Sequence, residues 1–397
     1  MDHGMMGVDW EQRIDYSRLR DERLAKARAA IAASDLDYML ILRLEDVRYI
    51  TSFRMHLAPV VALGWAGVAL AKDGDFVLYT IDEVNCRARM PWLADDQIDG
   101  RPNVRERPGI AEWAGRLKRR FPGIENATVG IDVWTPTIQA GLQEALPGAT
   151  FVDGYPTLLE AKIIKTEDEI SCLEEATALT EAGFQAALDA LRPGVRECEV
   201  LAAAWHKMTA LGSEWTQCSN IVASGPNTAP YRRVTSDRII RAGDLVVIDI
   251  GGCFNGYWGD FTRTWICGDG QPRDEQVELH QLAYDSLFNA CAAAKPGNTN
   301  FDVFQGAGGN VLGDSLGHGS GTNPWEPPFF SSQSEHDPVT LRPGMTMNIE
   351  PYTGEPEIGG FRVENNLVVT EDGPRIYTTF PFCERLVARR HELDRGT

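Results

Sequence analysis

Periodic hydrophobic positions predict helices and strands that alternate along the first part of the chain. Apolar residues at helical spacing predict a charged amphipathic helix over residues 16–33. Short apolar runs bounded by turn residues predict strands. The expected strands cover residues 37–42, 60–71, 76–80, 128–132 and 150–154, and a further helix covers residues 137–144. This alternation indicates an α/β domain over residues 1–157.

A helix-start signal opens the second part of the chain. Thr166 and Glu169 form a capping box, and apolar residues keep helical spacing after it until Pro193-Gly194. Further helices are expected over residues 197–211 and 274–295, with strands between 218 and 265 and between 345 and 370. The pattern predicts a second domain over residues 158–397.

The segment DLVVIDIGGCFNGYWGDFTRTW, residues 244–265, places two carboxylates in a hydrophobic frame. Asn255-Gly256 predicts a type I′ hairpin turn, because both central residues of that turn need positive φ. Counting outward from the turn sets Asp260 opposite Gly251, and Asp249 then lies on the same face, about 7 Å away at Cβ. Like charges this close repel unless a proton or a cation lies between them. The hairpin therefore favours a metal site over a turn-exposed acid, although a bulge beside Gly251 would shift the register.

Three other segments carry a ligand-type residue in an apolar or glycine-rich frame. They are His318 in SLGHGSG, Glu350 in GMTMNIEP and Glu364 in GGFRVENNLVVT. Taken singly, the histidine fits a loop residue and the two glutamates fit a strand end and an edge strand. Together with the two aspartates they form an oxygen-rich set suited to one or two Mn, Fe, Co or Zn ions.

Composition and charge narrow the class of protein without identifying it. The chain has 397 residues, and 57 acidic against 38 basic residues give a net charge of −19, which argues against nucleic acid and anionic membranes as partners. The N-terminal segment lacks the pattern of a secretory signal, and the longest apolar run, Ala58–Ala71, is too short to span a bilayer. Eight scattered cysteines are typical of reduced thiols in a cytoplasmic protein.

Several motifs resemble the pita-bread superfamily of aminopeptidase P, prolidase, methionine aminopeptidase and creatinase. The matching pieces are EAKIIKTEDEI, VVIDIGG with GYWGDFTRTW, LGHGSG, GMTMNIEP and RVENNLVVT. The resemblance implies a creatinase-type N-terminal domain, an α+β pita-bread catalytic domain, and a homodimer whose partner N-domain lies near the site. It implies two divalent metal ions, with Asp260 and Glu364 bridging them and Arg362 supporting a bridging carboxylate. The implied ligands are Asp249, Asp260, His318, Glu350 and Glu364.

Two positions depart from the peptidases of this superfamily, which use two further histidines. In SGPNTAPYRRV, Tyr231 or Arg232 stands where the first histidine belongs. Seven residues after His318 stands Trp325, followed by Glu326. Arginine stays protonated and tryptophan only donates a hydrogen bond, so neither can carry a proton as imidazole does.

These departures resemble the dimethylsulfoniopropionate lyase branch of the superfamily, although the first ligand lacks the D-x-D of that branch. The expected function is therefore cleavage of a C–S or C–N bond in a small carboxylate substrate, with Glu326 or else Tyr231 as the base. Arg232 or Arg233 would bind the carboxylate, and Trp258 and Trp325 would contact a cationic group. Glu326 equally fits an ion-pair acid that holds its loop, and the tryptophans fit core packing. The alternatives are an Xaa-Pro dipeptidase, an aminopeptidase P or a related amidohydrolase, and a non-catalytic binding module.

Overall fold

The chain forms two compact units, Met1–Lys162 and Ile163–Thr397. The computed structural model describes residues 14–56, 63–216, 220–231, 233–308 and 315–395. The first unit is an α/β domain and the second an α+β domain, which confirms the expected fold class. The division falls at the end of α6 (Tyr155–Ile163), whereas the sequence pattern set it between residues 157 and 158.

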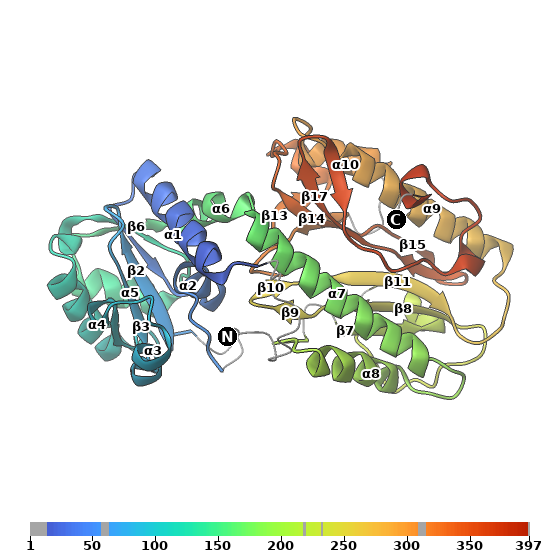
Figure 1. Ribbon diagram of the computed structural model, residues 1–397, viewed down its shortest axis with the longest axis horizontal. Coiled ribbons are helices and arrows are strands. Elements are labelled where there is room, and N and C mark those ends of the chain that lie inside the picture. Colours follow the sequence, from blue (N-terminus) through green and yellow to red (C-terminus); the bar gives the residue numbers. More distant parts are fainter. Residues whose placement is uncertain (1–13, 57–62, 217–219, 232, 309–314, 396–397) are drawn as a thin grey trace. The chain divides into compact units, whose positions relative to one another are not determined.

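Six strands form one mixed sheet in the first unit, in the order β4-β3-β2-β1-β5-β6 (Figure 1). The central strand β1 pairs antiparallel with β2 and parallel with β5. The strands are β1 (Tyr38–Ile41), β2 (Ala66–Ala71), β3 (Phe76–Thr80), β4 (Ile98–Gly100), β5 (Thr128–Ile131) and β6 (Thr150–Asp153). The strand expected over residues 60–71 thus begins only at Ala66, and residues 57–62 lie outside the described residues.

Helices cover both faces of this sheet, because successive strand residues point to opposite sides. Met39 packs in one core with Ile31 of the first helix, while the next residue, Leu40, packs in the other core with Trp113. The helices are α1 (Tyr16–Ala33), α2 (Leu44–Thr51), α3 (Glu83–Arg89), α4 (Arg107–Arg120), α5 (Pro136–Ala145) and α6. Both faces of the sheet are therefore buried, as a sheet with parallel pairs requires.

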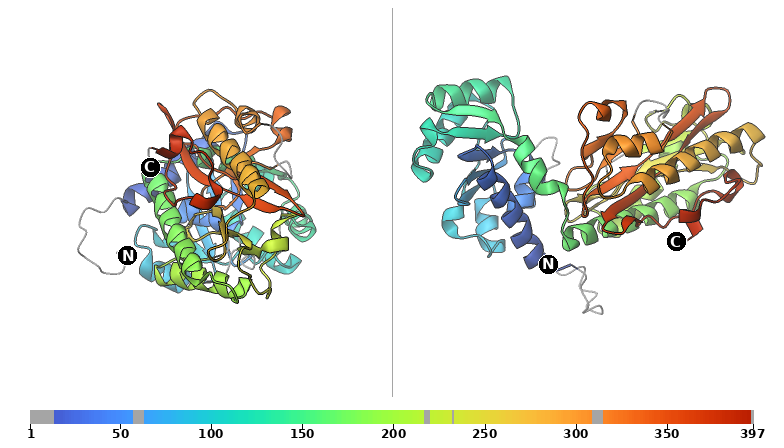
Figure 2. Two further views of the ribbon diagram at one scale, coloured as in Figure 1. Left: turned by 90° about the vertical axis from the view of Figure 1, so that its right-hand side faces the viewer. Right: turned by 90° about the horizontal axis from the view of Figure 1, so that it is seen from above.

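The described residues of the second unit form four α-helices and two larger sheets, which Figure 2 shows from two further directions. The helices are α7 (Glu167–Ala190), α8 (Glu197–Ala210), α9 (Asp274–Ala293) and α10 (Asn300–Gly306). One sheet has the order β11-β8-β7 and the other β13-β12-β14-β17-β18, and β9 with β10 and β15 with β16 form two-stranded ribbons. The strands are β7 (Asn220–Ser224), β8 (Leu245–Ile250), β9 (Cys253–Phe254), β10 (Tyr257–Trp258), β11 (Phe261–Ile266), β12 (Gly317–Gly319), β13 (Glu326–Phe330), β14 (Thr346–Ile349), β15 (Tyr352–Glu355), β16 (Gly359–Arg362), β17 (Asn365–Thr370) and β18 (Gly373–Ile376). Short 3₁₀ helices are η3 (Asp95–Gln97), η4 (Ile124–Asn126), η5 (Gly225–Thr228), η6 (Ser332–Glu335), η7 (Glu384–Leu386) and η8 (Glu392–Arg395).

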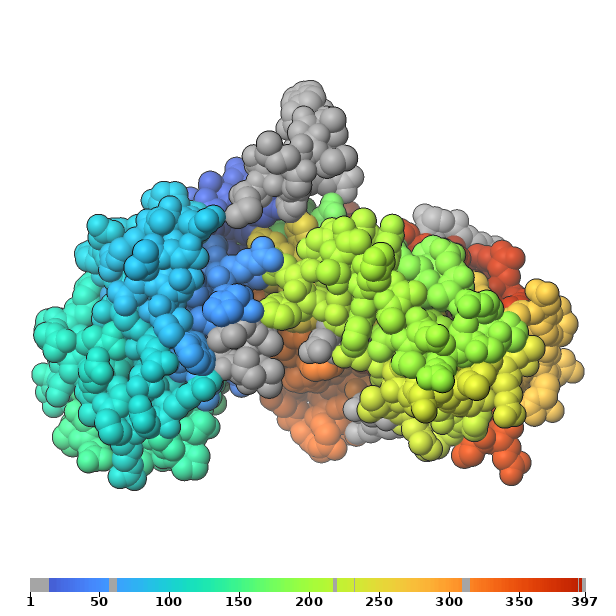
Figure 3. All heavy atoms as spheres, turned by 90° about the horizontal axis from the view of Figure 1, so that it is seen from below, coloured from blue at the N-terminus to red at the C-terminus, as the bar shows by residue number. Residues whose placement is uncertain are grey.

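Each larger sheet of the second unit packs against its own pair of helices. α7 and α8 share a core with the β11-β8-β7 sheet, and their residues, green to lime, form much of the face seen in Figure 3. α9 and α10 share a second core with the five-stranded sheet. The two sheets meet where Glu364 N donates a hydrogen bond of 3.1 Å to Thr262 O of β11. This junction brings β8, β11 and the β16–β17 connection together.

No helix in the described ranges is long and apolar enough to cross a membrane. The seven cysteines that the structure describes are all free thiols, and six of them are buried.

His280 makes the folding free energy depend on pH. Its ring lies fully buried in α9, edge-on to Phe361 at 5.9 Å, and burial lowers the pKa of His280 to about 3. The unfolded chain binds the proton at about pH 6.5, so the stability that the neutral ring contributes is present above pH 6.5 and is lost as the pH falls towards 3. We expect His280→Leu to abolish up to about 4 kcal/mol of this loss in denaturant titrations across that range. His206→Leu on the exposed face of α8 is the matched control and should leave the pH dependence as in the wild type.

Candidate metal centre

The hairpin between β8 and β11 sets the positions of the two aspartates. Asn255 and Gly256 have φ of 49° and 83°, as a type I′ turn requires, and Tyr257 pairs with Phe254. The same register continues into the longer strands, where Asp249 lies opposite Thr262. The predicted register is thus confirmed, and the glycines after β8 introduce no bulge.

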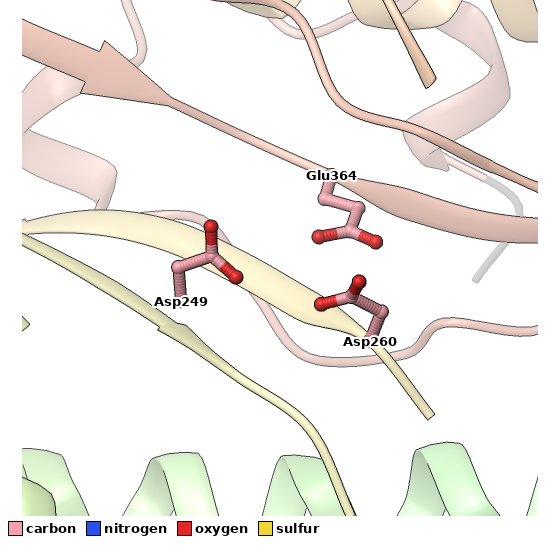
Figure 4. A group of neighbouring side chains, drawn as sticks. All are labelled: Asp249, Asp260 and Glu364. Carbon is pink, nitrogen blue, oxygen red and sulfur yellow. The ribbon is translucent and has the colours of Figure 1, made fainter. Parts of the chain in front are cut away.

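Glu364 joins the two aspartates from the β16–β17 connection. One ligand oxygen from each of Asp249, Asp260 and Glu364 lies within 4.8 Å of the others, and the three carboxylates face a common space (Figure 4). All three residues are at most 2% exposed. Two hydrogen bonds orient Glu364, because Thr262 Oγ1 donates to Oε2 at 3.0 Å and Asn348 Nδ2 donates to Oε1 at 3.1 Å.

His318 and Glu350 extend the cluster on the other side of Asp260. His318 Nε2 lies 3.8 Å from Asp260 Oδ2 and 3.7 Å from Glu350 Oε1. His318 Nδ1 lies 3.0 Å from Gly319 O, and since a carbonyl oxygen only accepts, Nδ1 carries the hydrogen in this contact. The lone pair of Nε2 is therefore directed at the carboxylates, in the tautomer that ligates metals.

The centre concentrates negative charge where water cannot screen it. Burial, and then the charges of Asp260, Glu350 and Asp249, raise the pKa of Glu364 well above its ordinary value. Burial likewise raises the pKa of Asp249, and it lowers the pKa of His318. Each change disfavours the charged form of the group, as expected for ionisable groups removed from water.

The five side chains fit divalent metal ions. Asp249 Oδ1 and His318 Nε2 are buried and have no hydrogen-bond partner among the described residues, which is costly for polar atoms that are not ligands. Four carboxylates and one imidazole are the donor set that Mn, Fe, Co and Zn accept. The structure thus brings together all five residues that the sequence singled out as ligands.

Arg362 supplies a positive charge at the edge of the cluster. Its Nη2 donates to Glu350 Oε2, and its Nε lies 3.6 Å from Asp249 Oδ2. Burial alone would lower the pKa of Arg362, but Glu350, Tyr231 and Asp249 raise it well above its ordinary value. The resemblance suggested that Arg362 supports a bridging carboxylate, whereas these contacts go to Glu350 and Asp249.

A cavity of about 640 Å³ opens beside the centre. Its wall includes Tyr231, Arg233 and Trp325, three of the residues that the sequence assigned to catalysis or substrate binding. Trp325 is half exposed, and its ring stands edge-on to His318 at 6.1 Å. The described residues that line it are Asn220, Ile221, Tyr231, Arg233, Val234, Asp249, Ser315, Gly317, His318, Trp325, Phe329, Glu350 and Arg362.

Two other expected site residues, Glu326 and Trp258, are not among the described residues that line the cavity. Glu326 is buried, its Oε2 lies 3.1 Å from Lys165 Nζ, and its Oε1 accepts from Asn323 N at 3.0 Å. The structure therefore gives Glu326 the loop-holding ion pair and not the position of a base. Trp258 is half-buried in β10 outside the cavity lining, and Arg232 lies outside the described residues.

Several residues around the centre were not singled out from the sequence. Thr262 could have been found, because the predicted register sets it directly opposite Asp249. Asn348 and Tyr352 flank Glu350 in sequence and Phe329 lies in β13, and nothing in their local pattern marks them. Their contacts depend on how the two sheets meet.

A buried set of four carboxylates and an imidazole beside a cavity defines a metalloenzyme. Residues 171–371 match the model of metallopeptidase family M24, and residues 23–163 match the creatinase/prolidase N-terminal domain. The chain therefore belongs to metallopeptidase family M24.

Curated relatives and solved structures agree with this assignment. The uncharacterized peptidase YqhT of Bacillus subtilis is 30% identical over 90% of this chain and 98% of its own length. An Xaa-Pro dipeptidase of Pyrococcus furiosus is 35% identical over 55% of this chain and 64% of its own length. The structure of an Xaa-Pro dipeptidase from Bacillus anthracis has a TM-score of 0.76 at 26% identity, covering 91% of this chain and 98% of that one. The prolidase of Pyrococcus horikoshii OT3 has a TM-score of 0.76 at 27% identity, covering 91% and 99%.

The expected lyase function is wrong. These relatives are peptidases and Xaa-Pro dipeptidases, and they favour the peptidase alternative over cleavage of a C–S or C–N bond. The departures at two positions, Tyr231 or Arg232 and Trp325, carry less weight than the similarity of the whole chain. The role of Glu326 as the base of that reaction falls with the lyase function.

Removing one carboxylate should stabilise the metal-free protein and abolish its response to metal. Folding raises the pKa of Glu364, so above the ordinary pKa of a glutamate this group destabilises the folded protein relative to the unfolded chain. The cost is about 1.4 kcal/mol for each tenfold change in its acid dissociation constant on folding. At pH 8 in chelator, Glu364→Gln should therefore unfold at a higher temperature than the wild type. Wild type should gain about 2.7 kcal/mol when Mn²⁺ is at 100 times its Kd, and the variant should not. Glu371→Gln, at an exposed turn, should behave as wild type in both solutions, and an equal Mn²⁺ response in all three proteins would exclude Glu364 as a ligand.

The ion pair between Lys165 and Glu326 should hold its loop rather than act in catalysis. Lys165→Met should cost about 3 kcal/mol in urea unfolding, because it leaves a buried carboxylate without its cation. Lys165→Met combined with Glu326→Gln should recover part of that loss. Additive losses in the double variant would show that the two side chains do not interact.

Proposed function

We propose that this chain is a metal-dependent hydrolase that cleaves Xaa-Pro dipeptides or closely related amides carrying a free carboxylate. The observation that carries the proposal is the convergence of five ligand side chains, three of which also line one cavity. Membership of metallopeptidase family M24 and the names of the dipeptidase relatives support peptide hydrolysis in particular.

The ligand residues would hold two divalent ions. Such ions supply Lewis acidity that polarises a scissile carbonyl group. Asp260 lies between Asp249 and His318, so its carboxylate can serve both halves of the centre. Arg362 keeps Glu350 oriented and limits the net negative charge before metal binds.

The cavity wall is suited to a small substrate with an acidic and an apolar group. Arg233 is exposed in this wall and can bind a carboxylate. Trp325 and Phe329 are each about half exposed and offer apolar surface near the centre. A dipeptide with a free C-terminal carboxylate and an apolar side chain matches this arrangement.

At the two positions where the related peptidases carry histidine, this chain has Tyr231 or Arg232 and Trp325, none of which is an imidazole. Burial, and then the charge of Asp249, raise the pKa of Tyr231 well above its ordinary value, so the phenol stays protonated. Trp325 offers only an indole N–H. Since a positioned general acid or base contributes about 10²–10⁴-fold, we expect a modest turnover number.

The function is tested by release of free amino acids from a dipeptide panel. Protein stripped of metal and reloaded separately with Mn²⁺, Co²⁺, Zn²⁺ or Fe²⁺ should hydrolyse Xaa-Pro dipeptides, best with an apolar first residue. Asp260→Asn should lower kcat/KM at least about 100-fold, because it removes a ligand shared by both halves of the centre. Asp269→Asn, an exposed aspartate nine residues further on, is the matched control and should keep full activity. Metal-loaded protein that hydrolyses no dipeptide in the panel would refute the proposal.

Two properties implied by the family resemblance stay predictions. One is a homodimer whose partner N-domain lies near the site, and the other is the choice among Mn, Fe, Zn and Co, since an oxygen-rich donor set accepts each of them.

A further inference from the structure

Tyr231 makes a short hydrogen bond to one oxygen of Asp249. Its hydroxyl donates to Asp249 Oδ2 at 2.5 Å, and Arg362 Nε lies 3.6 Å from the same oxygen. The other oxygen, Oδ1, has no hydrogen-bond partner among the described residues. One hydrogen-bond donor and one positive charge thus act on Oδ2 and leave Oδ1 for the centre.

The phenol ring is itself held in place by its surroundings. The guanidinium of Arg362 lies over the Tyr231 ring at 4.3 Å, and the ring of Tyr352 packs against it at 4.9 Å. Tyr352 Oη donates to Thr228 O at 2.8 Å, and Thr228 Oγ1 accepts from Gly360 N at 2.9 Å. The segment between β7 and β8 is therefore tied to β15 and β16 before any metal binds, and Tyr231 cannot easily turn away from Asp249.

We propose that Tyr231 is a positioning residue that acts through Asp249 and sets the affinity of the ion on the Asp249 side of the centre. The side chain of Asp249 has two rotatable bonds and two like-charged neighbours, so without a donor it can turn its oxygens away from Asp260 and Glu364. The hydrogen bond from Tyr231 fixes that rotation. Partners of this kind, one bond removed from the metal, commonly change metal affinity 10- to 100-fold.

Tyr231 or Arg232 stands where the related peptidases carry a histidine, and the hydrogen bond of Tyr231 to Asp249 suits metal binding rather than proton transfer. The inference rests on the proposed metal-binding role of the centre and is independent of which peptide is cleaved. The two ions should differ in their dependence on Tyr231, because Asp249 groups with Asp260 and Glu364, whereas His318 lies next to Asp260 and Glu350.

The test is a Mn²⁺ titration of metal-free protein by isothermal titration calorimetry, with Co²⁺ visible absorption as the second measurement. Tyr231→Phe removes only the hydroxyl. It should weaken the affinity for one ion 10- to 100-fold and leave the affinity for the other within threefold of wild type. The part of the Co²⁺ absorption that belongs to the weakened ion should then develop at a higher Co²⁺ concentration.

Tyr284→Phe is the matched control, because Tyr284 Oη also donates to a carboxylate, Asp394 Oδ2, at 2.6 Å. This variant should bind both ions as wild type does, and the unfolding temperatures of the metal-free proteins show that each is folded. Wild-type affinity for both ions in Tyr231→Phe, or an equal loss in Tyr284→Phe, would overturn the role of Tyr231. A wild type that binds neither Mn²⁺ nor Co²⁺ would instead overturn the metal centre and the proposed function together.

Discussion

Mutual repulsion among buried carboxylates is the constraint around which the second unit is built. Asp249 and Asp260 share one hairpin and Glu364 follows more than a hundred residues later, yet the fold holds one oxygen of each within 4.8 Å of the others. The surrounding framework opposes this repulsion. Arg263, itself buried, donates to the backbone oxygens of Thr262 and Glu364 and so locks β11 to the β16–β17 connection. Because the carboxylates are attached to rigid strands, they cannot reduce their repulsion by moving apart, as they could on a flexible loop.

Local chemistry explains which parts of the fold could be predicted from the sequence. The Asn255-Gly256 turn determines the register of its own hairpin, and the capping box at Thr166 marks the start of α7 where the structure begins that helix. α4 (Arg107–Arg120) was not predicted, because Pro108 and Gly109 obscure its start even though Ile110, Trp113 and Leu117 keep helical spacing. The sequence pattern is sufficient to predict an element whose start or register is set by turn and cap residues. It is not sufficient where tertiary packing determines the element.

The ligand set could be predicted, whereas the neighbours of those ligands could not. Each ligand is a polar residue in an apolar frame, which is visible locally. The partner of Glu326 is Lys165, 161 residues away, and the hydroxyl of Tyr231, in the connection between β7 and β8, donates to Asp249, 18 residues away. Such contacts are decided by tertiary structure, so a role in proton transfer and a role in an ion pair look alike in the sequence. The same ambiguity misdirected the functional expectation towards lyase chemistry.

Trp325 and Glu326 are neighbours in sequence, but one is placed to contact substrate and the other stabilises the fold. One residue faces the cavity, and the next is anchored in the interior by its ion pair with Lys165. Substitutions at position 325 can therefore alter substrate preference while the backbone around it stays anchored. A protein organised in this way can diversify its chemistry during evolution without first becoming less stable, which is consistent with an indole at this position on an otherwise intact metal-binding scaffold.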